Sequence, residues 1–295
     1  LPPRDVEIVL RPGDELILTR ARTPGTPAER GPTGAILRPA TIACTLDEVF
    51  AAVRAGEPIW FDDGRIGGVI HGVTPDEIRV RIAQARADGA TLGADQRIHL
   101  PESRLELPAL TAKDRGDLAF VARHADLVEM SFVQRSDDVA ALHEALSAEG
   151  GEHLGVVLKI GTQRGFRELP RLLLAAMRGR SFGVMIARGD LAVECGWERL
   201  SEVQEEILRV SGAAHAPVIR AAPAPEMMPM AMSMAVSERA EAVMLAVNNR
   251  GQHIVEAVRA LDDMLVRMQA HQHGKRAALR PLGVAESLLP PRDRG

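Results

Sequence analysis

The sequence has very few cysteines. Cys44 and Cys195 are the only two in 295 residues, and they form neither a CxxC pair nor a spacing typical of metal ligands. We therefore expect a reducing compartment and two free packing residues rather than a disulfide. The chain also lacks an apolar run of membrane-spanning length, and its first ten residues have no signal-peptide pattern. These absences predict no membrane association and a cytoplasmic location.

An excess of charge of one sign is missing too. The formal net charge is −4, and basic residues are interspersed with acidic ones. This excludes an extended basic surface for nucleic acid, whereas a small anionic substrate needs only a local patch. Lysine is scarce, with Lys113, Lys159 and Lys275 among 36 basic residues. A compact ammonium kept in such an arginine-rich chain is a candidate functional group, and Lys159 has the most suggestive position.

Residues 1–105 contain short β-like runs at 6–10, 14–20, 58–70, 76–85 and 96–101, with turn signals such as "RPGD", "TPGTP", "DDG" and "ADGA". This pattern predicts a small all-β domain, with one short helix over 45–56. Residues 106–275 instead alternate between apolar runs and amphipathic segments. The runs lie at 126–133, 155–160, 183–187, 217–221 and 241–247, and the helical segments at 136–150, 164–179, 198–215, 226–236 and 251–271. Residues 276–295 are expected to form a polar tail.

Alternating strands and helices predict an α/β fold with a covered parallel sheet. Because no dinucleotide glycine fingerprint is present, the pattern favours part of a (β/α)8 TIM-type barrel. Five βα units do not close an eight-stranded barrel. The other three units are expected either upstream of Leu1 or on another chain. The remaining alternative is an open variant of the fold that lacks them. The missing initiator methionine indicates a processed polypeptide or a fragment.

The stretch "GVMIARGDLAVE" ends an apolar strand on Arg188, Gly189 and Asp190, where a helix is expected to begin. In barrels of this kind, chemistry is located at the carboxyl ends of the strands. Gly189 allows a ligand close to the backbone, and the amides of Gly189 and Asp190 could bind an anion. The Asp190 carboxylate suits Mg²⁺ or Mn²⁺, although it could instead merely cap the helix.

Lys159 ends the preceding apolar strand, "GVVLKI". Its ammonium could face a phosphoryl group or an enolate, or it could form a salt bridge in the barrel mouth. Three other features are weaker candidates. The sequence Asp62-Asp63-Gly64 favours a hairpin turn over a ligand contact. The methionine run at 227–234 favours helix packing over a metal site, and His271 and His273 are expected to be solvated.

Four segments together resemble the pyruvate kinase family. They are 107–139, "VVLKIGTQRGF" (156–166), "FGVMIARGDLAVE" (182–194) and 238–261. The match keeps one order from about residue 8 to 282 and is nearest to a bacterial branch without a C-terminal regulatory domain. "IWFDDGRIGG" through "RIHLP" is similar to that family's β-barrel lid. The resemblance implies a lid at 1–105 followed by barrel strands 4–8 over 106–275.

The resemblance implies phosphoryl transfer from phosphoenolpyruvate to ADP, giving pyruvate and ATP, with Mg²⁺ (or Mn²⁺) and K⁺. By this likeness Lys159 stabilises the moving phosphoryl group, and Asp190 binds the metal. The amides of Gly189 and Asp190 hold the substrate carboxylate, and Asp63 lies on the nucleotide side of the lid. A homo-oligomer is also expected, as for many barrel proteins with exposed helical faces.

The chain departs from the family at several positions. Gly161 stands where the family has a second metal-binding glutamate, Ala222 where it has a threonine, and Gln96 where a lysine is common. Strands one to three, which carry the K⁺ ligands and a phosphate-binding arginine, are not in the chain. Two other functions therefore stay open: a non-catalytic binding or regulatory relative, and an enolate lyase or aldolase on a similar barrel.

Overall fold

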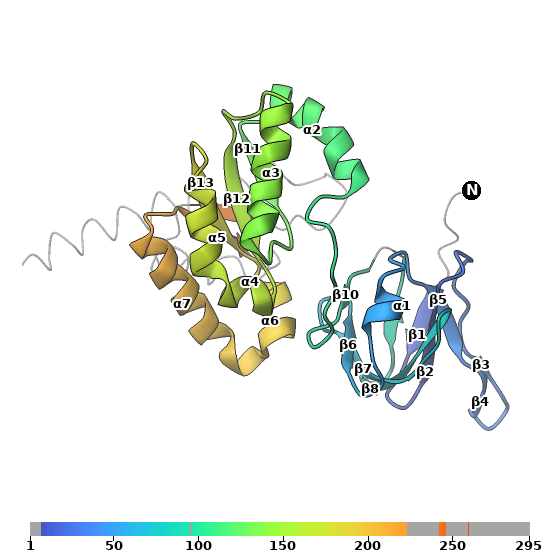
Figure 1. The fold of residues 1–295 in the computed structure, drawn as a ribbon. Coiled ribbons are helices and arrows are strands. Elements are labelled where there is room, and N and C mark those ends of the chain that lie inside the picture. The colour runs from blue at the N-terminus through green and yellow to red at the C-terminus, as the bar shows by residue number, and fades with distance from the viewer. Residues whose placement is uncertain (1–6, 95, 223–241, 246–258, 260–295) are drawn as a thin grey trace, which may run out of the picture. The chain divides into compact units, whose positions relative to one another are not determined.

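The computed structural model describes residues 7–94, 96–222, 242–245 and 259. The chain forms two compact units, Leu1–Ala216 and Pro217–Gly295. Each unit is described on its own. The first unit contains an N-terminal β module and three consecutive βα segments (Figure 1).

The β module, residues 7–100, contains ten strands and one short helix. Its strands are β1 (Ile8–Leu10), β2 (Glu15–Thr19), β3 (Glu29–Arg30), β4 (Ile36–Arg38), β5 (Ala40–Ala43), β6 (Pro58–Phe61), β7 (Ile66–Val73), β8 (Glu77–Gln84), β9 (Ala90–Leu92) and β10 (Ile98–His99). Six of them form one sheet in the order β10-β6-β7-β8-β2-β5, in which only β2 and β5 pair in parallel. The pairs β1-β9 and β3-β4 form two smaller antiparallel sheets.

Alternation of side chains explains how these strands make a core. In β8, Ile78, Val80 and Ile82 are buried, while the arginines between them point outward. Period-2 burial of this kind is expected for a sheet with one covered face. The strands predicted near residues 6–10, 14–20, 58–70, 76–85 and 96–101 are confirmed, and the predicted helix shrinks to α1 (Val49–Ala52).

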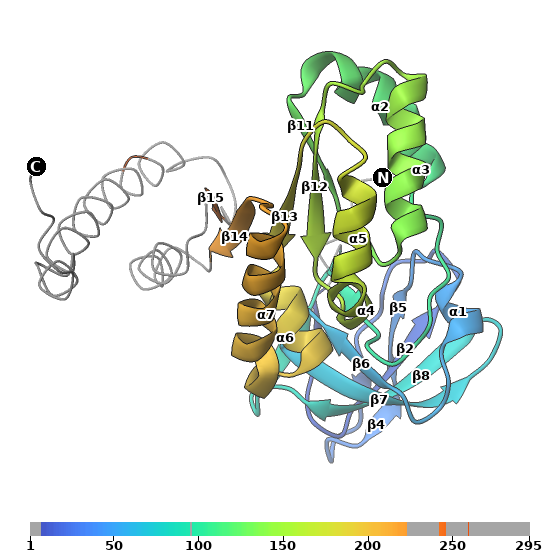
Figure 2. The same ribbon diagram turned by 60° about the vertical axis from the view of Figure 1, so that its left-hand side comes forward.

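The βα part of the first unit begins after the β module. Its elements are α2 (Ala112–His124), β11 (Leu127–Met130), α3 (Ser136–Ala148), β12 (Gly155–Ile160), α4 (Gln163–Arg167), α5 (Leu169–Ala176), β13 (Phe182–Ile186), α6 (Arg188–Cys195), the 3-10 helix Trp197–Arg199 and α7 (Leu200–Ala213). Strands β11, β12 and β13 are adjacent and parallel. Helices α3, α5 and α7 lie along one side of these strands (Figure 2). The predicted parallel arrangement is confirmed for these strands.

Local sequence signals set several boundaries. The hydroxyl of Thr111 accepts a hydrogen bond from the Asp114 amide at 3.1 Å and so caps α2, a helix that the periodicity did not predict. The single helix predicted over 164–179 is wrong, because the chain breaks at Glu168 into α4 and α5. Pro170 explains the break, since proline fits the first turn of a helix but not its interior.

The second unit is described only in part. Strand β14 (Val218–Ala222) pairs in parallel with β15 (Ala242–Leu245), so the strands predicted at 217–221 and 241–247 are confirmed. The methionine run at 227–234, the helix predicted at 226–236, His271, His273 and the tail lie outside the described residues, as does the helix predicted at 251–271 except for residue 259. Within the described part, no helix is both long and apolar enough to span a membrane.

Candidate active site

Asp190 lies where β13 gives way to α6. The strand ends at Ile186, and Ala187 caps the helix that starts at Arg188. The amide of Ala187 donates to the carbonyl of Ile160 at 3.0 Å, which ties this turn to β12. Asp190 is 3% exposed, whereas Gly189 is exposed and has open space where a side chain would stand. A ligand can therefore approach the first turn of α6 closely at Gly189.

Lys159 comes from the neighbouring strand β12, in which every residue is buried. Its Nζ lies 3.3 Å from Oδ2 of Asp190, and this is an ion pair without hydrogen-bond geometry. The same Nζ lies 4.9 Å from the centre of the Phe132 ring, so an aromatic face covers the ammonium. A buried lysine needs such partners. The structure thus brings together the two side chains that the sequence singled out at adjacent strand ends.

Asp63 reaches the same place from the β module. The turn between β6 and β7 has Asp62 at φ 50° and Asp63 at φ 52°, a left-handed conformation that aspartate tolerates better than most residues. The predicted hairpin turn is confirmed. A side chain on Gly64 would lie 3.0 Å from Cγ2 of Val193, so the turn packs directly against α6.

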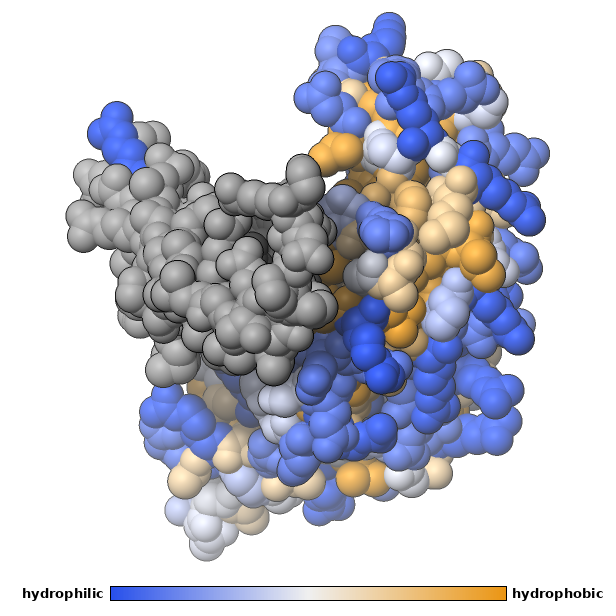
Figure 3. All heavy atoms as spheres, turned by 90° about the vertical axis from the view of Figure 1, so that its left-hand side faces the viewer, coloured by the Kyte–Doolittle hydropathy of each residue, from blue (hydrophilic) through white to orange (hydrophobic). Residues whose placement is uncertain are grey.

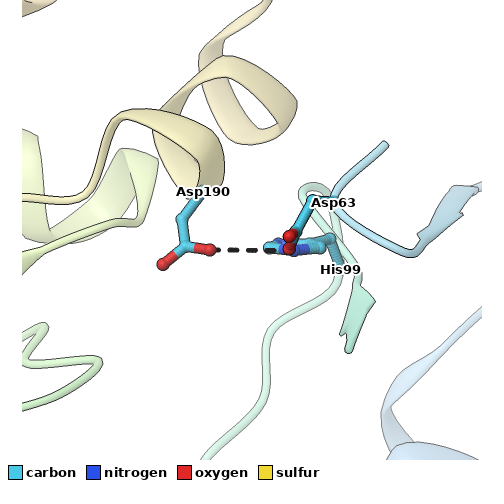
Figure 4. A group of neighbouring side chains, drawn as sticks. All are labelled: Asp63, His99 and Asp190. Carbon is cyan, nitrogen blue, oxygen red and sulfur yellow. Dashed lines mark ion pairs between the residues drawn. The ribbon is translucent and has the colours of Figure 1, made fainter. Parts of the chain in front are cut away.

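Two further residues, Arg97 and His99, belong to the site and were not predicted. The Nη1 of Arg97 hydrogen-bonds Oδ1 of Asp190 at 3.2 Å and lies 3.8 Å from Oδ1 of Asp63. The Nε2 of His99 lies 3.9 Å from Oδ1 of Asp63 and 3.9 Å from Oδ1 of Asp190. Figure 4 shows Asp63, His99 and Asp190 directed toward one another. The sequence signal for Arg97 and His99 was the Arg-Ile-His pattern, in which Arg97 directly precedes β10 and residues two apart in an extended segment share a face.

Burial shapes the protonation of this region. Desolvation lowers the pKa of His99 from 6.5, and the charges of Asp190 and Asp63 oppose that effect. The imidazole is therefore neutral near pH 7. Desolvation also raises the pKa of Glu194, which accepts a hydrogen bond from the Gln163 amide at 3.2 Å and links α6 to α4.

Similarity to known proteins establishes the family of this chain. The family model for the pyruvate kinase barrel domain matches residues 7–265. The chain belongs to the pyruvate kinase family.

Individual relatives cover most of the chain. A pyruvate kinase of Geobacillus stearothermophilus is 29% identical over 90% of this chain and 44% of its own length. One of Bacillus licheniformis is 28% identical over 95% of this chain and 47% of its own length. One of Methylorubrum extorquens is 33% identical over 72% and 44%. The chain thus spans less than half the length of these curated pyruvate kinases.

Gly161, Gln96 and Ala222, which were predicted to depart from the pyruvate kinase pattern, lie in three different parts of the structure. A Cβ on Gly161 would lie 3.0 Å from Oδ2 of Asp190, so a longer side chain there would point into the site. Gln96 accepts a hydrogen bond from the Gly93 amide at 3.0 Å within its own loop. Ala222 is the last residue of β14, in the second unit. Cys44 and Cys195 are free, as predicted.

Proposed function

We propose that this chain carries the phosphoryl-transfer site of a pyruvate kinase, which converts phosphoenolpyruvate and ADP to pyruvate and ATP. The observation that carries the proposal is the Lys159–Asp190 pair at the ends of adjacent parallel strands, with Asp63 of the β module beside it. In this proposal the β module is the lid domain that precedes barrel strands 4–8 in the chain. Family membership supports this arrangement.

Each residue has a chemical role in this reaction. The phosphorus–oxygen bond of the enol phosphate breaks, its electron pair stays on the enol oxygen, and phosphorus bonds to a terminal oxygen of ADP. The Lys159 ammonium, covered by Phe132, stabilises the negative charge of the moving group in a water-poor setting. The exposed Gly189 and the amides of the first turn of α6 hold the substrate carboxylate. The enolate then takes a proton on carbon to give pyruvate.

The side chains present also fit a divalent metal. Oδ2 of Asp190 is buried and lies 3.3 Å from the Lys159 ammonium without a hydrogen bond, and Asp63 supplies a second carboxylate with an oxygen within 4.8 Å of an Asp190 oxygen. Mg²⁺ binds through one or two carboxylates together with substrate oxygens, so Asp190 and Asp63 would hold it. When bound, the metal neutralises phosphoryl charge. K⁺ is expected from the family, and its ligands there lie outside the segments that this chain matches.

Two wider expectations accompany this proposal. Free cysteines fit a cytoplasmic location, which we propose together with a glycolytic role. The face seen in Figure 3 is mostly hydrophilic, with hydrophobic surface gathered in its upper part. Among the described residues, large exposed apolar side chains on or next to helices include Phe120, Leu174 and Trp197. We propose a homo-oligomer because barrel proteins with exposed helical faces commonly associate.

A second candidate function is a non-catalytic pyruvate-kinase-like binding protein. The observation that favours it is the Arg97–Asp190 hydrogen bond, which places a guanidinium on the metal-binding carboxylate, in a chain that has Gly161 beside it. Such a protein would bind phosphoenolpyruvate without turnover.

The deciding experiment is Mg²⁺-dependent pyruvate formation from phosphoenolpyruvate and ADP by the purified chain, with its native flanking sequence. Asp190→Asn and Lys159→Gln are expected to lower the rate at least about 100-fold. Asp88→Asn is the matched control, because Asp88 is an exposed carboxylate of the β module paired with Arg86. Phosphoenolpyruvate binding without pyruvate formation, even in the Gly161→Glu variant, would support the binding protein instead.

A further inference from the structure

Three potential metal ligands converge from three separate elements. Asp63 lies in the β6–β7 turn, His99 in β10 and Asp190 in α6. Each offers one ligand atom, and these atoms all lie within 4.8 Å of one another (Figure 4). The β module thus contributes a nitrogen and an oxygen to a cluster whose third member belongs to the strand-end site.

The strongest sign of a ligand is the buried imidazole nitrogen of His99, which has no hydrogen-bond partner. Its side chain is 5% exposed, and its Nε2 has no hydrogen-bond partner although it points at two carboxylates. A buried polar atom without a partner is unfavourable, because it has lost its hydrogen bonds to water without replacing them. The Asp190 oxygen nearest to this nitrogen is Oδ1, which accepts a hydrogen bond from the half-exposed Arg97 side chain. One cation with vacant coordination positions would satisfy the imidazole nitrogen and the carboxylate together.

We propose that Asp63, His99 and Asp190 form a binding site for a divalent transition metal of the zinc, cobalt or nickel class. Imidazole nitrogen suits these ions, whereas Mg²⁺ prefers an all-oxygen shell. This site goes beyond the proposed function, because its ligand set includes the His99 nitrogen. It shares Asp190 with the metal of phosphoryl transfer, so the two ions exclude each other.

Small movements complete the geometry. Two ligand atoms of a tetrahedral zinc site lie about 3.4 Å apart, given bonds of about 2.1 Å. The Nε2 of His99 is 3.9 Å from each aspartate oxygen, so these two pairs must close by roughly half an ångström, and the two aspartate oxygens, within 4.8 Å of each other, must close by at most about 1.4 Å. Asp63 is 58% exposed and lies on a turn, so it can supply that movement.

Arg97 is the internal competitor for this site. Its guanidinium bonds Asp190 and lies near Asp63, in the space that a metal ion would share. Its side chain is 56% exposed, so it can swing into solvent when a metal binds. Removing the guanidinium should therefore tighten metal binding, whereas removing any of the three ligands should weaken it. Opposite effects from residues that touch the same carboxylate distinguish a metal site from general loss of structure.

The test is a titration of the intact chain with Co²⁺, followed by its visible absorption and by displacement with Zn²⁺. We expect one equivalent with the strong bands of a four- or five-coordinate ion, and these bands should persist in a large excess of Mg²⁺. His99→Asn and Asp63→Asn should each weaken binding by at least about 10- to 100-fold. Arg97→Gln should tighten it.

His71→Asn is the matched control, because His71 also lies in the β module and its Nε2 is 3.1 Å from a single carboxylate, Glu15. It should leave the titration unchanged. Equal Co²⁺ affinity in wild type, His99→Asn and Asp63→Asn would overturn the proposal, as would weaker binding in Arg97→Gln or displacement by equimolar Mg²⁺. The exposed Asp63 keeps the test decisive if His99→Asn fails to fold. The Co²⁺ titration does not measure pyruvate formation. A failure of this metal-site proposal is therefore distinguishable from a failure of the phosphotransferase proposal, which the pyruvate assay detects.

Discussion

Gly161 faces Asp190 across the gap between the end of β12 and the first turn of α6. A Cβ built on Gly161 would lie 3.0 Å from Oδ2 and 3.1 Å from Cβ of Asp190, and 3.3 Å from Cβ of Ala187. The chain therefore has room for no side chain at this position without a small shift of its neighbours. A side chain that does enter would lie directly on the candidate metal-binding carboxylate.

Two substitutions of Gly161 distinguish the steric effect of a side chain from the effect of an added metal ligand. Gly161→Ala should destabilise the fold by about 1 kcal/mol, because Asp190 and Ala187 must yield by a few tenths of an ångström. Gly161→Glu adds a second carboxylate and should raise Mn²⁺ or Mg²⁺ affinity about tenfold over Gly161→Ala, equivalent to about 1.4 kcal/mol. Urea unfolding and calorimetric metal titration measure the two effects. Equal metal affinity in both variants would show that position 161 does not reach the site.

Gly212→Ala is the control for the first effect. Gly212 is exposed on α7, with open space around its missing side chain. Alanine there should stabilise the helix by roughly 0.5 to 1 kcal/mol, the opposite sign to Gly161→Ala.

The Lys159–Asp190 pair should be strongly coupled. Asp190→Asn leaves a buried ammonium, and breaking a buried pair in this way typically costs about 3 to 5 kcal/mol, whereas Lys159→Met should cost less because Arg97 still hydrogen-bonds the Asp190 carboxylate. The double variant should lose about 1 to 3 kcal/mol less than the sum of the single changes. A double-mutant cycle by chemical denaturation measures this coupling. The exposed pair Lys113–Asp117 is the comparison, and strictly additive losses at Lys159 and Asp190 would contradict the ion pair.

Periodicity was sufficient for much of the fold. Continuous apolar runs such as 155–160 and alternating runs such as 76–85 became the strands β12 and β8, because burial on two faces or on one face leaves those patterns directly in sequence. Short strands such as β3, whose two residues are both exposed, leave no such pattern. Helix α2 was missed because its apolar positions are sparse, and its clearest signal is the Thr111–Asp114 cap.

The site was predictable where the chain changes character abruptly. Lys159 and Asp190 stand out because a charge ends an apolar strand, and parallel strands bring such ends together. Arg97 and His99 could not be found this way, because their role depends on the β module contacting α6. Their position results from contacts between residues about 90 apart in sequence, which no local spacing records.

Strand β7 contains glycines that only tight packing explains. A Cβ on Gly68 would lie 2.5 Å from Cγ1 of Val80 and 2.8 Å from the backbone oxygen of Arg81. Gly68→Ala should therefore destabilise the β module by about 1 to 3 kcal/mol. In the same strand, a Cβ on Gly72 would lie at least 3.6 Å from the nearest atoms of Arg79, which is an ordinary contact, so Gly72→Ala should be nearly neutral. Thermal unfolding of the two variants makes the comparison, and similar melting temperatures would contradict this packing.

His143 should make stability sensitive to acid. Its Nε2 is buried without a hydrogen-bond partner near Gly179, and desolvation lowers its pKa from 6.5. The unfolded chain therefore binds a proton at a higher pH than the folded chain, so this residue's contribution to stability is lost as pH falls below about 6.5. His143→Gln has no proton to gain and should lose less stability between pH 7 and pH 5 than wild type does. Unfolding free energies measured across that range test the sign, and parallel pH profiles for the two proteins would show that His143 is as accessible to protons in the folded state as in the unfolded one.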